Sequence, residues 1–458
     1  MKIKRRDFLR GAAAASGAAL FGRATPSVGA GVLPGDKGLA SLPPPETSGI
    51  EHIVVVMMEN RSFDHFLGWL PNADGRQGGL TYLDRAGTAH ETHPLAPDFT
   101  GCSHPDPDHS YAGGRVQRDG GAMDGFLRSG SNDEYAIGFY VEEDRPFYSA
   151  LARNFTAFDR SFCSILGPTF PNRLFLHSAQ TDRLSNTPMP AVMPTIWDRL
   201  AAAGVSALYY FSNLPFLGLW GAKYIPISRL YPQFLLDAAA GNLPRVSFID
   251  PRFTVPPDDT QNDDHPPADI RRGDAFLAQT FQAVASGPGW PNTVFIVTYD
   301  EWGGFFDHVA PPRATAPNGV DPDLVSGKAL LGFRIPTVVA SPFTRGEPDD
   351  PRVKGMTLDH TSILKLIEWR FGLDPLTARD GSRDIQNLAR ALKLRHPDAT
   401  VPTLPTPEEP PPTPCLPPGA PEPSAAGVEP APSDTTDSRN PWPGLRDSGL
   451  LAAWELPE

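Results

Sequence analysis

Two apolar runs, residues 53–58 (IVVVMM) and 294–299 (VFIVTY), constrain the fold of this chain more than any other feature. Both are rich in β-branched residues and neither alternates with polar residues, which is typical of strands buried on both faces. Residues 335–341 form a third such run, and residues 207–211 and 246–249 are weaker candidates. We therefore predict an α/β fold in which helices flank a mostly parallel central sheet on both faces.

Amphipathic segments between these runs predict the covering helices. Residues 269–285 and 361–371 carry apolar side chains at helical spacing, and Asp359 precedes the second segment as a candidate cap. Residues 111–147 are rich in glycine and polar side chains. We expect this stretch to form an insertion over the functional site.

The 458 residues divide into four parts by composition. Residues 1–30 combine a basic start with a short run of alanine and glycine, which predicts a signal peptide. Residues 31–49 have the composition of a linker, and residues 50–395 have the pattern of one catalytic domain. Residues 396–458 form a Pro-rich tail that we expect to be largely disordered, with one short helix near its end. We expect the tail beyond residue 401 to be dispensable for catalysis.

The string RRDFLR, which starts at Arg5, resembles a twin-arginine export signal. It predicts export by the twin-arginine machinery and a periplasmic or secreted protein, with an ordinary signal peptide or a basic N-terminal helix as the alternatives. The apolar run that follows has about twelve residues, whereas a transmembrane helix needs about 20. We expect no transmembrane span in the mature chain. In an oxidising compartment, Cys102 and Cys163 are a candidate disulfide pair.

The chain carries a formal net charge of −13. A nucleic-acid-binding protein needs clustered lysine and arginine to neutralise phosphates, so this charge argues against a nucleic-acid partner. It does not argue against a small phosphorylated substrate, because one cation-bearing cleft fits within an acidic surface.

Ligand-type side chains follow the two strongest strand predictions. Glu59 and Asn60 follow the first run, and Asp300 and Glu301 follow the second. The carboxyl ends of parallel strands meet at one edge of a sheet, so we expect these four side chains to converge. Neighbouring carboxylates repel one another unless a cation lies between them. Oxygen donors favour Mg, Ca, Mn or Zn, and the pattern predicts a divalent metal site, with solvated strand-end caps as the alternative.

A candidate nucleophile lies in the string GPTFPNR, which begins at Gly167. Its glycine and prolines predict a rigid turn, and Pro171 favours a helix from Asn172 onward. Thr169 would then face the positive end of that helix, where a phosphate also binds favourably. Contact with a metal would lower the pKa of its hydroxyl and activate it for attack. Ser164 is the rival nucleophile, and a threonine that caps its own helix is the non-catalytic alternative.

Four histidines are further candidates for the site, each close to an acidic residue in the sequence: His109, His265, His308 and His360. A neighbouring carboxylate raises the pKa of a histidine and fixes its tautomer. We predict catalytic roles for all four, although a single histidine is more often structural.

These motifs together carry a resemblance. The strings HIVVVMMENRSFDHFLG, GPTFPNRL, TYDEWGGFFDHV and LDHTSILKLIEWRFGL resemble the bacterial phosphoesterase family of phospholipases C and acid phosphatases, within the alkaline phosphatase superfamily. The resemblance covers residues 50–392. It implies a metal held by Glu59, Asn60, Thr169, Asp300 and Glu301. It also implies that Thr169 is the nucleophile and that His109, His265 and His308 hold phosphoryl oxygens or protonate the leaving group.

The activity implied by this resemblance is that of a metal-dependent phospholipase C. Such an enzyme hydrolyses the phosphodiester of a phospholipid to diacylglycerol and a phosphorylated head group, here through a phosphothreonine intermediate. The first alternative is an acid phosphatase acting on phosphomonoesters. The others are a sulfatase, for which no formylglycine-type motif is present, and a non-catalytic periplasmic protein that binds a phosphate ligand. The aromatic candidates for a head-group pocket are Tyr209, Tyr210, Trp220 and Trp302.

Overall fold

The computed structural model describes residues 42–255, 259–412, 415 and 439–457, so the predicted signal peptide lies outside the described residues. An eight-stranded sheet forms the centre, in the order β14-β6-β13-β10-β1-β9-β7-β8. Its strands are β1 (His52–Met58), β6 (Thr156–Phe158), β7 (Ala207–Phe211), β8 (Ser228–Leu230), β9 (Val246–Ile249), β10 (Thr293–Tyr299), β13 (Val338–Ala340) and β14 (Arg352–Lys354).

Most neighbours in this sheet are parallel, as predicted. β1 lies between β9 and β10 and is parallel to both, and β7 is parallel to β8 and β9. β13 is the exception, because it runs antiparallel to β10 and β6. β1 and β10 pair over their whole length, from His52 opposite Thr293 to Met58 opposite Tyr299. The two strands therefore end side by side.

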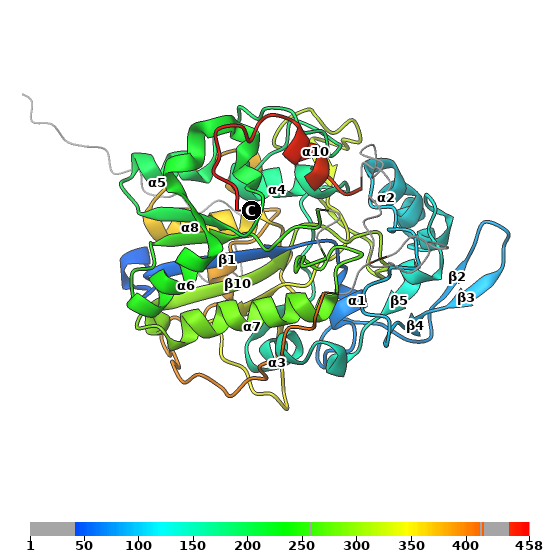
Figure 1. Cartoon of the computed structure of the whole chain (residues 1–458), viewed down its shortest axis with the longest axis horizontal. Helices are drawn as coiled ribbons and strands as arrows, with labels where there is room; N and C mark the ends of the chain where they lie inside the picture. The colour runs from blue at the N-terminus through cyan, green and yellow to red at the C-terminus, as the bar shows by residue number, and fades with distance from the viewer. Residues whose placement is uncertain (1–41, 256–258, 413–414, 416–438, 458) are drawn as a thin grey trace, which may run out of the picture. The chain divides into compact units, whose positions relative to one another are not determined.

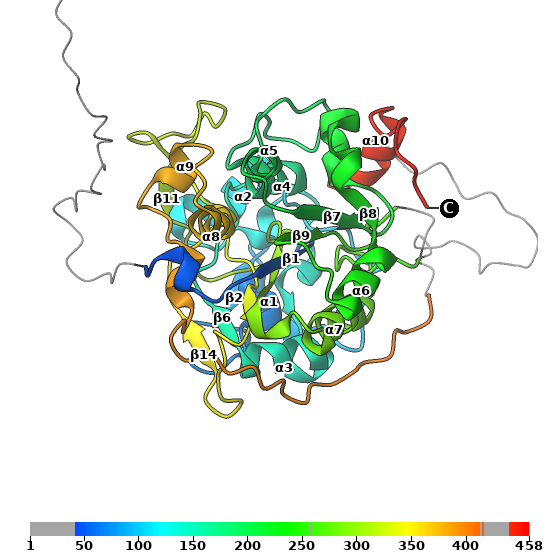
Figure 2. The same cartoon turned by 90° about the vertical axis from the view of Figure 1, so that its left-hand side faces the viewer.

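Helices cover both faces of the sheet, which confirms the predicted fold class. In Figures 1 and 2, α3 (Pro146–Asn154), α6 (Tyr231–Ala240) and α7 (Ile270–Ser286) lie on one side, and α4 (Thr169–Ser178), α5 (Ile196–Ala202) and α8 (Thr361–Phe371) on the other. Alternate residues of β1 enter different cores, Val54, Val56 and Met58 one and Ile53, Val55 and Met57 the other. An uninterrupted apolar run is what such a two-sided strand requires.

The predicted helices are present. α8 spans the residues predicted for it, and the Asp359 carboxylate accepts a hydrogen bond from the Thr361 backbone N–H at 2.8 Å. α7 begins one residue later than predicted, after the capping Asp269. None of the helices among the described residues has the length and apolar character needed to cross a bilayer.

The remaining elements are short. The helices are α1 (Phe63–Leu67), α2 (Tyr111–Arg118), α9 (Ala378–Gly381) and α10 (Trp442–Asp447), with 3-10 turns at Pro45–Thr47, Asp119–Gly121, Phe126–Arg128, Glu134–Ile137, Glu142–Asp144, Phe216–Ile227, Trp290–Asn292 and Leu388–Ala391. The strands are β2 (Thr81–Leu83), β3 (Ala89–Glu91), β4 (His93–Pro94), β5 (Gly138–Phe139), β11 (Arg313–Thr315) and β12 (Lys328–Leu330).

The C-terminal part of the chain differs from the predicted disordered tail. Residues 416–438 lie outside the described residues, but residues 439–457, which we call the C-terminal segment, pack on the domain. The predicted short helix is α10, and the segment buries Trp442, Leu445, Leu451 and Trp454 in the core that contains α4 and α8. The reason is local: four large apolar side chains follow the proline-dense stretch and supply a surface that can be buried.

The disulfide of the structure also differs from the candidate pair. Cys102 bonds to Cys415, 313 residues away in the sequence, whereas Cys163 is a buried free thiol. Cys163 lies inside the domain next to Gly332. Its sulfur atom takes up the space that a side chain at position 332 would need, since a Cβ built on Gly332 would lie 2.0 Å from Cys163 Sγ. The bond ties the Pro-rich stretch to the loop before α2.

Candidate active site

The ends of β1 and β10 bring the four predicted ligands together. Glu59, Asn60, Asp300 and Glu301 are all fully buried. The backbone N–H groups of Asn60 and Glu301 donate to Asp300 Oδ1 at 3.1 and 2.7 Å. The convergence expected from two parallel strand ends is therefore present in the structure.

The backbone at this edge is specially shaped. Asn60 has a φ of 62°, in the left-handed region that asparagine tolerates better than most residues. Gly303 has a φ of 65°, and a Cβ on it would lie 2.1 Å from the Asn60 carbonyl oxygen. Only glycine allows this close approach, and the approach holds the two strand-end loops against each other.

Thr169 is the first residue of α4, three residues earlier than the helix start predicted from the sequence. The Asn172 side chain shapes the preceding turn, because it accepts from the Ile165 N–H at 3.1 Å and donates to the Gly167 carbonyl at 2.8 Å. Thr169 is fully buried, and its hydroxyl has no hydrogen-bond partner. A buried hydroxyl without a partner at a helix N-terminus is poised to meet an anionic group.

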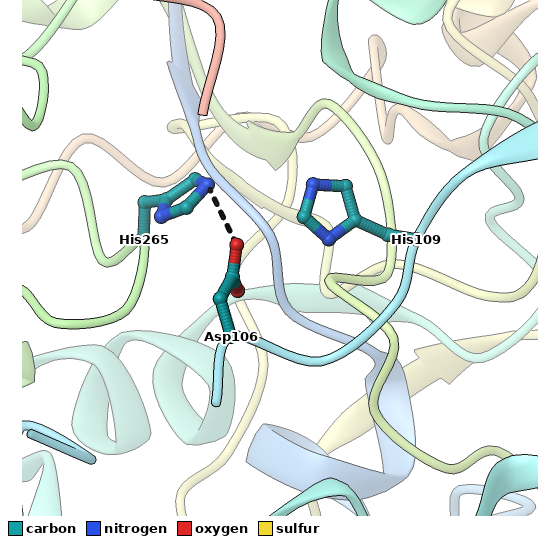
Figure 3. A group of neighbouring side chains, drawn as sticks. All are labelled: Asp106, His109 and His265. Carbon is teal, nitrogen blue, oxygen red and sulfur yellow. Dashed lines mark ion pairs between the residues drawn. The ribbon is translucent and has the colours of Figure 1, made fainter. Parts of the chain in front are cut away.

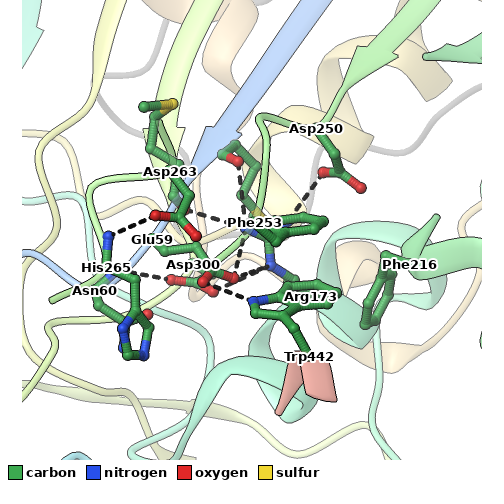
Figure 4. A network of polar contacts seen from close by, with 12 residues as sticks. Glu59, Asn60, Arg173, Phe216, Asp250, Phe253, Asp263, His265, Asp300 and Trp442 are labelled. Carbon is green, nitrogen blue, oxygen red and sulfur yellow. Dashed lines mark hydrogen bonds and ion pairs between the residues drawn. The ribbon is translucent and has the colours of Figure 1, made fainter. Parts of the chain in front are cut away.

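Arg173 lies one turn after Thr169 on the same face of α4 and links this helix to the strand ends. Its guanidinium lies 3.1 Å from Glu59 Oε1, 3.1 Å from Asp300 Oδ2 and 2.9 Å from Asp250 Oδ1 (Figure 4). The residue is 1% exposed. Arg173 thus neutralises part of the negative charge that the strand ends concentrate, and it joins the helix that Thr169 begins to them.

A second group at the site consists of Asp106, His109 and His265, whose candidate ligand atoms all lie within 4.8 Å of one another (Figure 3). In both histidines Nδ1 contacts a backbone carbonyl, Pro107 O at 2.8 Å and Pro266 O at 2.6 Å. The Nε2 atom of each ring therefore faces the site. His265 Nε2 and both Asp106 carboxylate oxygens lack a hydrogen-bond partner.

The two histidines differ in charge. Burial disfavours the charged form of His109, but the carboxylates of Glu301 and Asp106 outweigh it and raise the pKa of His109 to about 9. Burial lowers the pKa of His265, which is therefore neutral at pH 7. Burial also raises the pKa of the Glu301 carboxyl to about 8, against the lowering effect of His109. Two imidazoles of opposite protonation thus flank one centre.

His308 is not brought to this centre. Its ring nitrogens contact the carboxylates of Asp64 and Asp74, at 2.5 and 3.1 Å. Asp64 and Asp307 both pair with the buried Arg334 at 2.9 Å. The group Asp64–Asp307–His308 is therefore a charge-balanced network around Arg334.

His360 is also engaged elsewhere. Its Nδ1 contacts the Ser164 hydroxyl at 3.0 Å, and its Nε2 contacts the Tyr299 carbonyl at 2.9 Å. The rival nucleophile Ser164 is thus paired with His360, whereas the Thr169 hydroxyl is unpaired. Of the predicted catalytic residues, the structure groups His109 and His265 at the strand ends, and Thr169 begins the helix that Arg173 joins to them.

The residues at the strand ends fit a divalent cation. Buried oxygen atoms without a hydrogen-bond partner occur on three of the five predicted ligands: Asn60 Oδ1, Thr169 Oγ1 and Glu301 Oε1. The other two, Glu59 and Asp300, are carboxylates that accept from Arg173 and keep further lone pairs. A buried oxygen without a hydrogen-bond partner destabilises the folded protein unless a bound ion or ligand contacts it. All five are the hard donors that such cations prefer.

Some residues of the site were missed by the sequence analysis. Asp250 directly follows β9, so the same strand-end rule would have identified it. Arg173 ends the string GPTFPNR that contains Thr169, and Asp106 lies three residues before His109. Trp442, whose indole donates to Glu59 at 2.8 Å, had no local signal.

The aromatic residues proposed for a head-group pocket are not assembled into one. The Trp302 indole donates to Gln117, the Trp220 indole to the Met193 carbonyl and the Tyr210 hydroxyl to Asp237. The Tyr209 hydroxyl binds Asp250. All four are buried, and their polar atoms are paired inside the domain. A cavity of about 300 Å³ instead reaches Asp106 from the outside, lined also by Cys102, Pro267 and Cys415.

Comparison with known proteins assigns the chain to a family. The model of the Phosphoesterase family matches residues 50–374, the stretch that carries both strand ends, Thr169, His109 and His265. The chain belongs to the Phosphoesterase family. It is a hydrolase of phosphoric esters, in agreement with the resemblance seen in its motifs.

Named relatives of this phosphoesterase include plant and bacterial proteins. Non-specific phospholipase C6 of Arabidopsis thaliana is 34% identical over 371 residues, which cover 73% of this chain and 70% of the relative. Phospholipase C B of Mycobacterium tuberculosis is 33% identical over 448 residues, covering 81% of each chain. Among solved structures, the phosphonate monoester hydrolase of Agrobacterium radiobacter matches with 12% identity and a TM-score of 0.36, over 75% of this chain and 77% of that one.

Proposed function

We propose that this phosphoesterase is an exported, cation-dependent phospholipase C. It would hydrolyse the phosphodiester of phospholipids to diacylglycerol and a phosphorylated head group, through a phosphothreonine at Thr169. The observation that carries this proposal is the unpartnered, buried Thr169 hydroxyl on the helix that Arg173 joins to the strand ends. Relatives named phospholipase C at about one-third identity support the choice of substrate.

In this proposal, Thr169, His109 and His265 each have a separate role in the reaction. Thr169 attacks phosphorus as the bond from phosphorus to the diacylglycerol oxygen breaks, and the positive end of α4 favours the negative phosphoryl group next to it. His265 accepts the proton of the Thr169 hydroxyl at Nε2 and passes it to the departing diacylglycerol oxygen. His109, whose pKa is raised to about 9, would turn its Nε2–H from the Arg439 carbonyl, 3.0 Å away, to a phosphoryl oxygen of the substrate. His265, neutral with a free Nε2, accepts the proton of the water that later hydrolyses the phosphothreonine. A divalent cation, when bound by the five ligands, neutralises phosphoryl charge and lowers the pKa of a hydroxyl that it contacts.

We expect the purified protein to contain one divalent cation per chain, of Ca, Mg, Mn or Zn. Glu301→Ala and Asp300→Asn should lose it, because each removes an oxygen donor from the site, and elemental analysis measures the loss. The matched control is His308→Asn in the Arg334 network, which should keep the cation content of the wild type. Full activity of a preparation free of divalent metal would refute this part of the proposal.

A substrate panel tests the reaction itself. We expect turnover of phosphatidylcholine and of p-nitrophenyl phosphorylcholine, with release of diacylglycerol or p-nitrophenol, and much slower turnover of p-nitrophenyl phosphate. The reverse order of rates would identify an acid phosphatase that uses the same residues. Binding without turnover of any of these compounds would identify a non-catalytic phosphate-ligand protein.

Export is the remaining part of the proposal. The Cys102–Cys415 disulfide supports it, because disulfides persist in oxidising compartments outside the cytoplasm. Replacing both Arg5 and Arg6 by lysine should leave the precursor in the cytoplasm, since the twin-arginine receptor recognises guanidinium geometry rather than charge. Cell fractionation and immunoblotting measure the distribution. Unchanged export of the double variant would favour an ordinary signal peptide.

A further inference from the structure

The C-terminal segment, residues 439–457, reaches the centre of the site. The indole of Trp442, the first residue of α10, donates from Nε1 to Glu59 Oε2 at 2.8 Å (Figure 4). The Arg439 carbonyl oxygen lies 3.0 Å from His109 Nε2. One short segment therefore contacts two predicted site residues, and it lies outside the residues 50–374 that match the family model.

Trp442 is held firmly in this position. Its ring stacks on Phe253 with centroids 3.4 Å apart and an angle of 9° between the planes, and Phe170 packs against it edge-on at 5.7 Å. The Asn440 side chain accepts from the Trp442 N–H at 3.2 Å and donates to the Thr254 carbonyl at 3.0 Å. Trp442 is 0% exposed. An indole held by one stacked and one edge-on ring presents its N–H in one direction only.

Glu59 needs two donors to be fixed, and Trp442 supplies one of them. Arg173 approaches Oε1 at 3.1 Å, whereas Trp442 approaches Oε2. With one donor on each oxygen, the plane of the carboxylate is set, and each oxygen keeps a lone pair. Groups that hydrogen-bond a metal ligand orient it, and their removal typically lowers metal affinity by about 10–100-fold.

We propose that Trp442 is a positioning residue of the catalytic centre, which orients the Glu59 carboxylate for the divalent cation, so that the C-terminal segment completes the site. This inference rests on the proposed function, in which Glu59 is a cation ligand. It also replaces the expectation that the whole tail is dispensable for catalysis.

The test compares two tryptophans of the same segment. Trp442→Phe keeps the aromatic ring but removes the N–H that Glu59 accepts. Trp454→Phe is the matched control, because that indole is also buried but donates to the Gly221 carbonyl at 3.0 Å. The full-length protein, freed of metal with EDTA, is titrated with Mn²⁺, and electron paramagnetic resonance measures the free ion. Turnover of p-nitrophenyl phosphorylcholine is recorded at each Mn²⁺ concentration.

We expect Trp442→Phe to weaken Mn²⁺ binding by about tenfold or more, and Trp454→Phe to leave it unchanged. The activity of Trp442→Phe should recover as Mn²⁺ is raised, since the catalytic groups remain in place. Unchanged or tighter Mn²⁺ binding by Trp442→Phe would overturn the inference, and so would equal weakening by both variants. Glu59→Gln distinguishes a failure of the proposed cation site from a failure of the proposed role of Trp442. If this variant binds Mn²⁺ as tightly as the wild type, Glu59 is not a ligand, and the cation site and the inference about Trp442 are both wrong.

A measurement on the wild type decides the matter if Trp442→Phe does not fold. Coupling between two sites is reciprocal, so an indole that favours cation binding must itself be held more tightly when the cation is bound. Hydrogen–deuterium exchange of peptides from residues 439–447 should slow when Mn²⁺ is added to the wild type but not to Glu59→Gln. Exchange that does not respond to Mn²⁺ in the wild type would overturn the inference.

Discussion

Replacing Thr169 by alanine should lower kcat by two or more orders of magnitude while the cation remains bound. The variant removes the attacking oxygen, and a covalent step cannot occur without it. The other four predicted ligands stay in place, so Mn²⁺ binding should weaken but persist. Thr169→Ser should keep measurable activity, because its hydroxyl reaches the same position with fewer rotamer restrictions.

The thermal stability of Thr169 variants provides a second test of the role of the hydroxyl. The Thr169 hydroxyl is buried and has no hydrogen-bond partner, so its removal breaks no hydrogen bond of the folded state. Alanine also removes the buried γ-methyl, whereas valine replaces the hydroxyl alone by a group of similar size. Thr169→Val should lack activity as Thr169→Ala does, and we expect the metal-free Thr169→Val protein to unfold at the same temperature as the wild type or at a higher one. A loss of activity with unchanged stability distinguishes a lost nucleophile from a damaged fold.

Ser164→Ala is the matched control for the nucleophile. This serine lies on the same stretch of chain, but its hydroxyl is paired with His360. Rapid quenching with substrate should trap phosphate on a wild-type peptide that contains Thr169. Near-normal rates for Thr169→Ala together with an inactive Ser164→Ala would assign the nucleophile to the serine. Activity in both variants would favour direct attack by water.

Replacing Arg173 by methionine should be among the most destabilising substitutions in the chain. The guanidinium is the shared partner of Glu59, Asp250 and Asp300, all of them buried. Removing one side of a buried ion pair typically costs about 3–5 kcal/mol, because the remaining charge is left without compensation. Urea unfolding of the metal-free protein measures the loss. The control Arg446→Met removes an arginine that is 40% exposed and pairs with Asp447, and it should cost about 1 kcal/mol or less.

The effect of Arg173→Met should depend on pH in a definite direction. Burial already raises the pKa of Glu59 well above its usual value, and that of Asp250 is raised as well. A carboxyl whose pKa is higher in the folded state than in the unfolded state binds its proton more tightly when folded. Protonation therefore stabilises the folded state as the pH falls through the folded-state pKa. The loss in free energy of unfolding caused by Arg173→Met should be largest at neutral pH and should shrink toward pH 5. A loss that grows as the pH falls would contradict this account.

Much of the fold and part of the site could be predicted from short stretches of sequence. The apolar runs of β1 and β10 identify strands buried on both faces, because such strands need apolar side chains at every position. The polar pairs that follow them converge because parallel neighbours end at the same edge. The boundaries of α8 and the cap at Asp359 follow from side chains within a few residues of one another.

The rest depended on contacts between residues far apart in the chain. Trp442 and Glu59 are 383 residues apart and Cys102 and Cys415 are 313 apart, and no local pattern relates such residues. The four histidines looked alike in the sequence, each near an acidic residue. Only the packing of the domain placed His109 and His265 at the strand ends and His308 in the network of Arg334.

The sequence by itself thus determined the sheet, its covering helices and the edge at which polar side chains collect, because backbone hydrogen bonding and apolar periodicity act locally. Only the tertiary structure decided which charges meet at that edge. The energy of a buried charge depends on every group within a few ångströms, whatever its position in the chain. Arg173 became the partner of three carboxylates, and the C-terminal segment became part of the site, through that long-range balance of burial and charge.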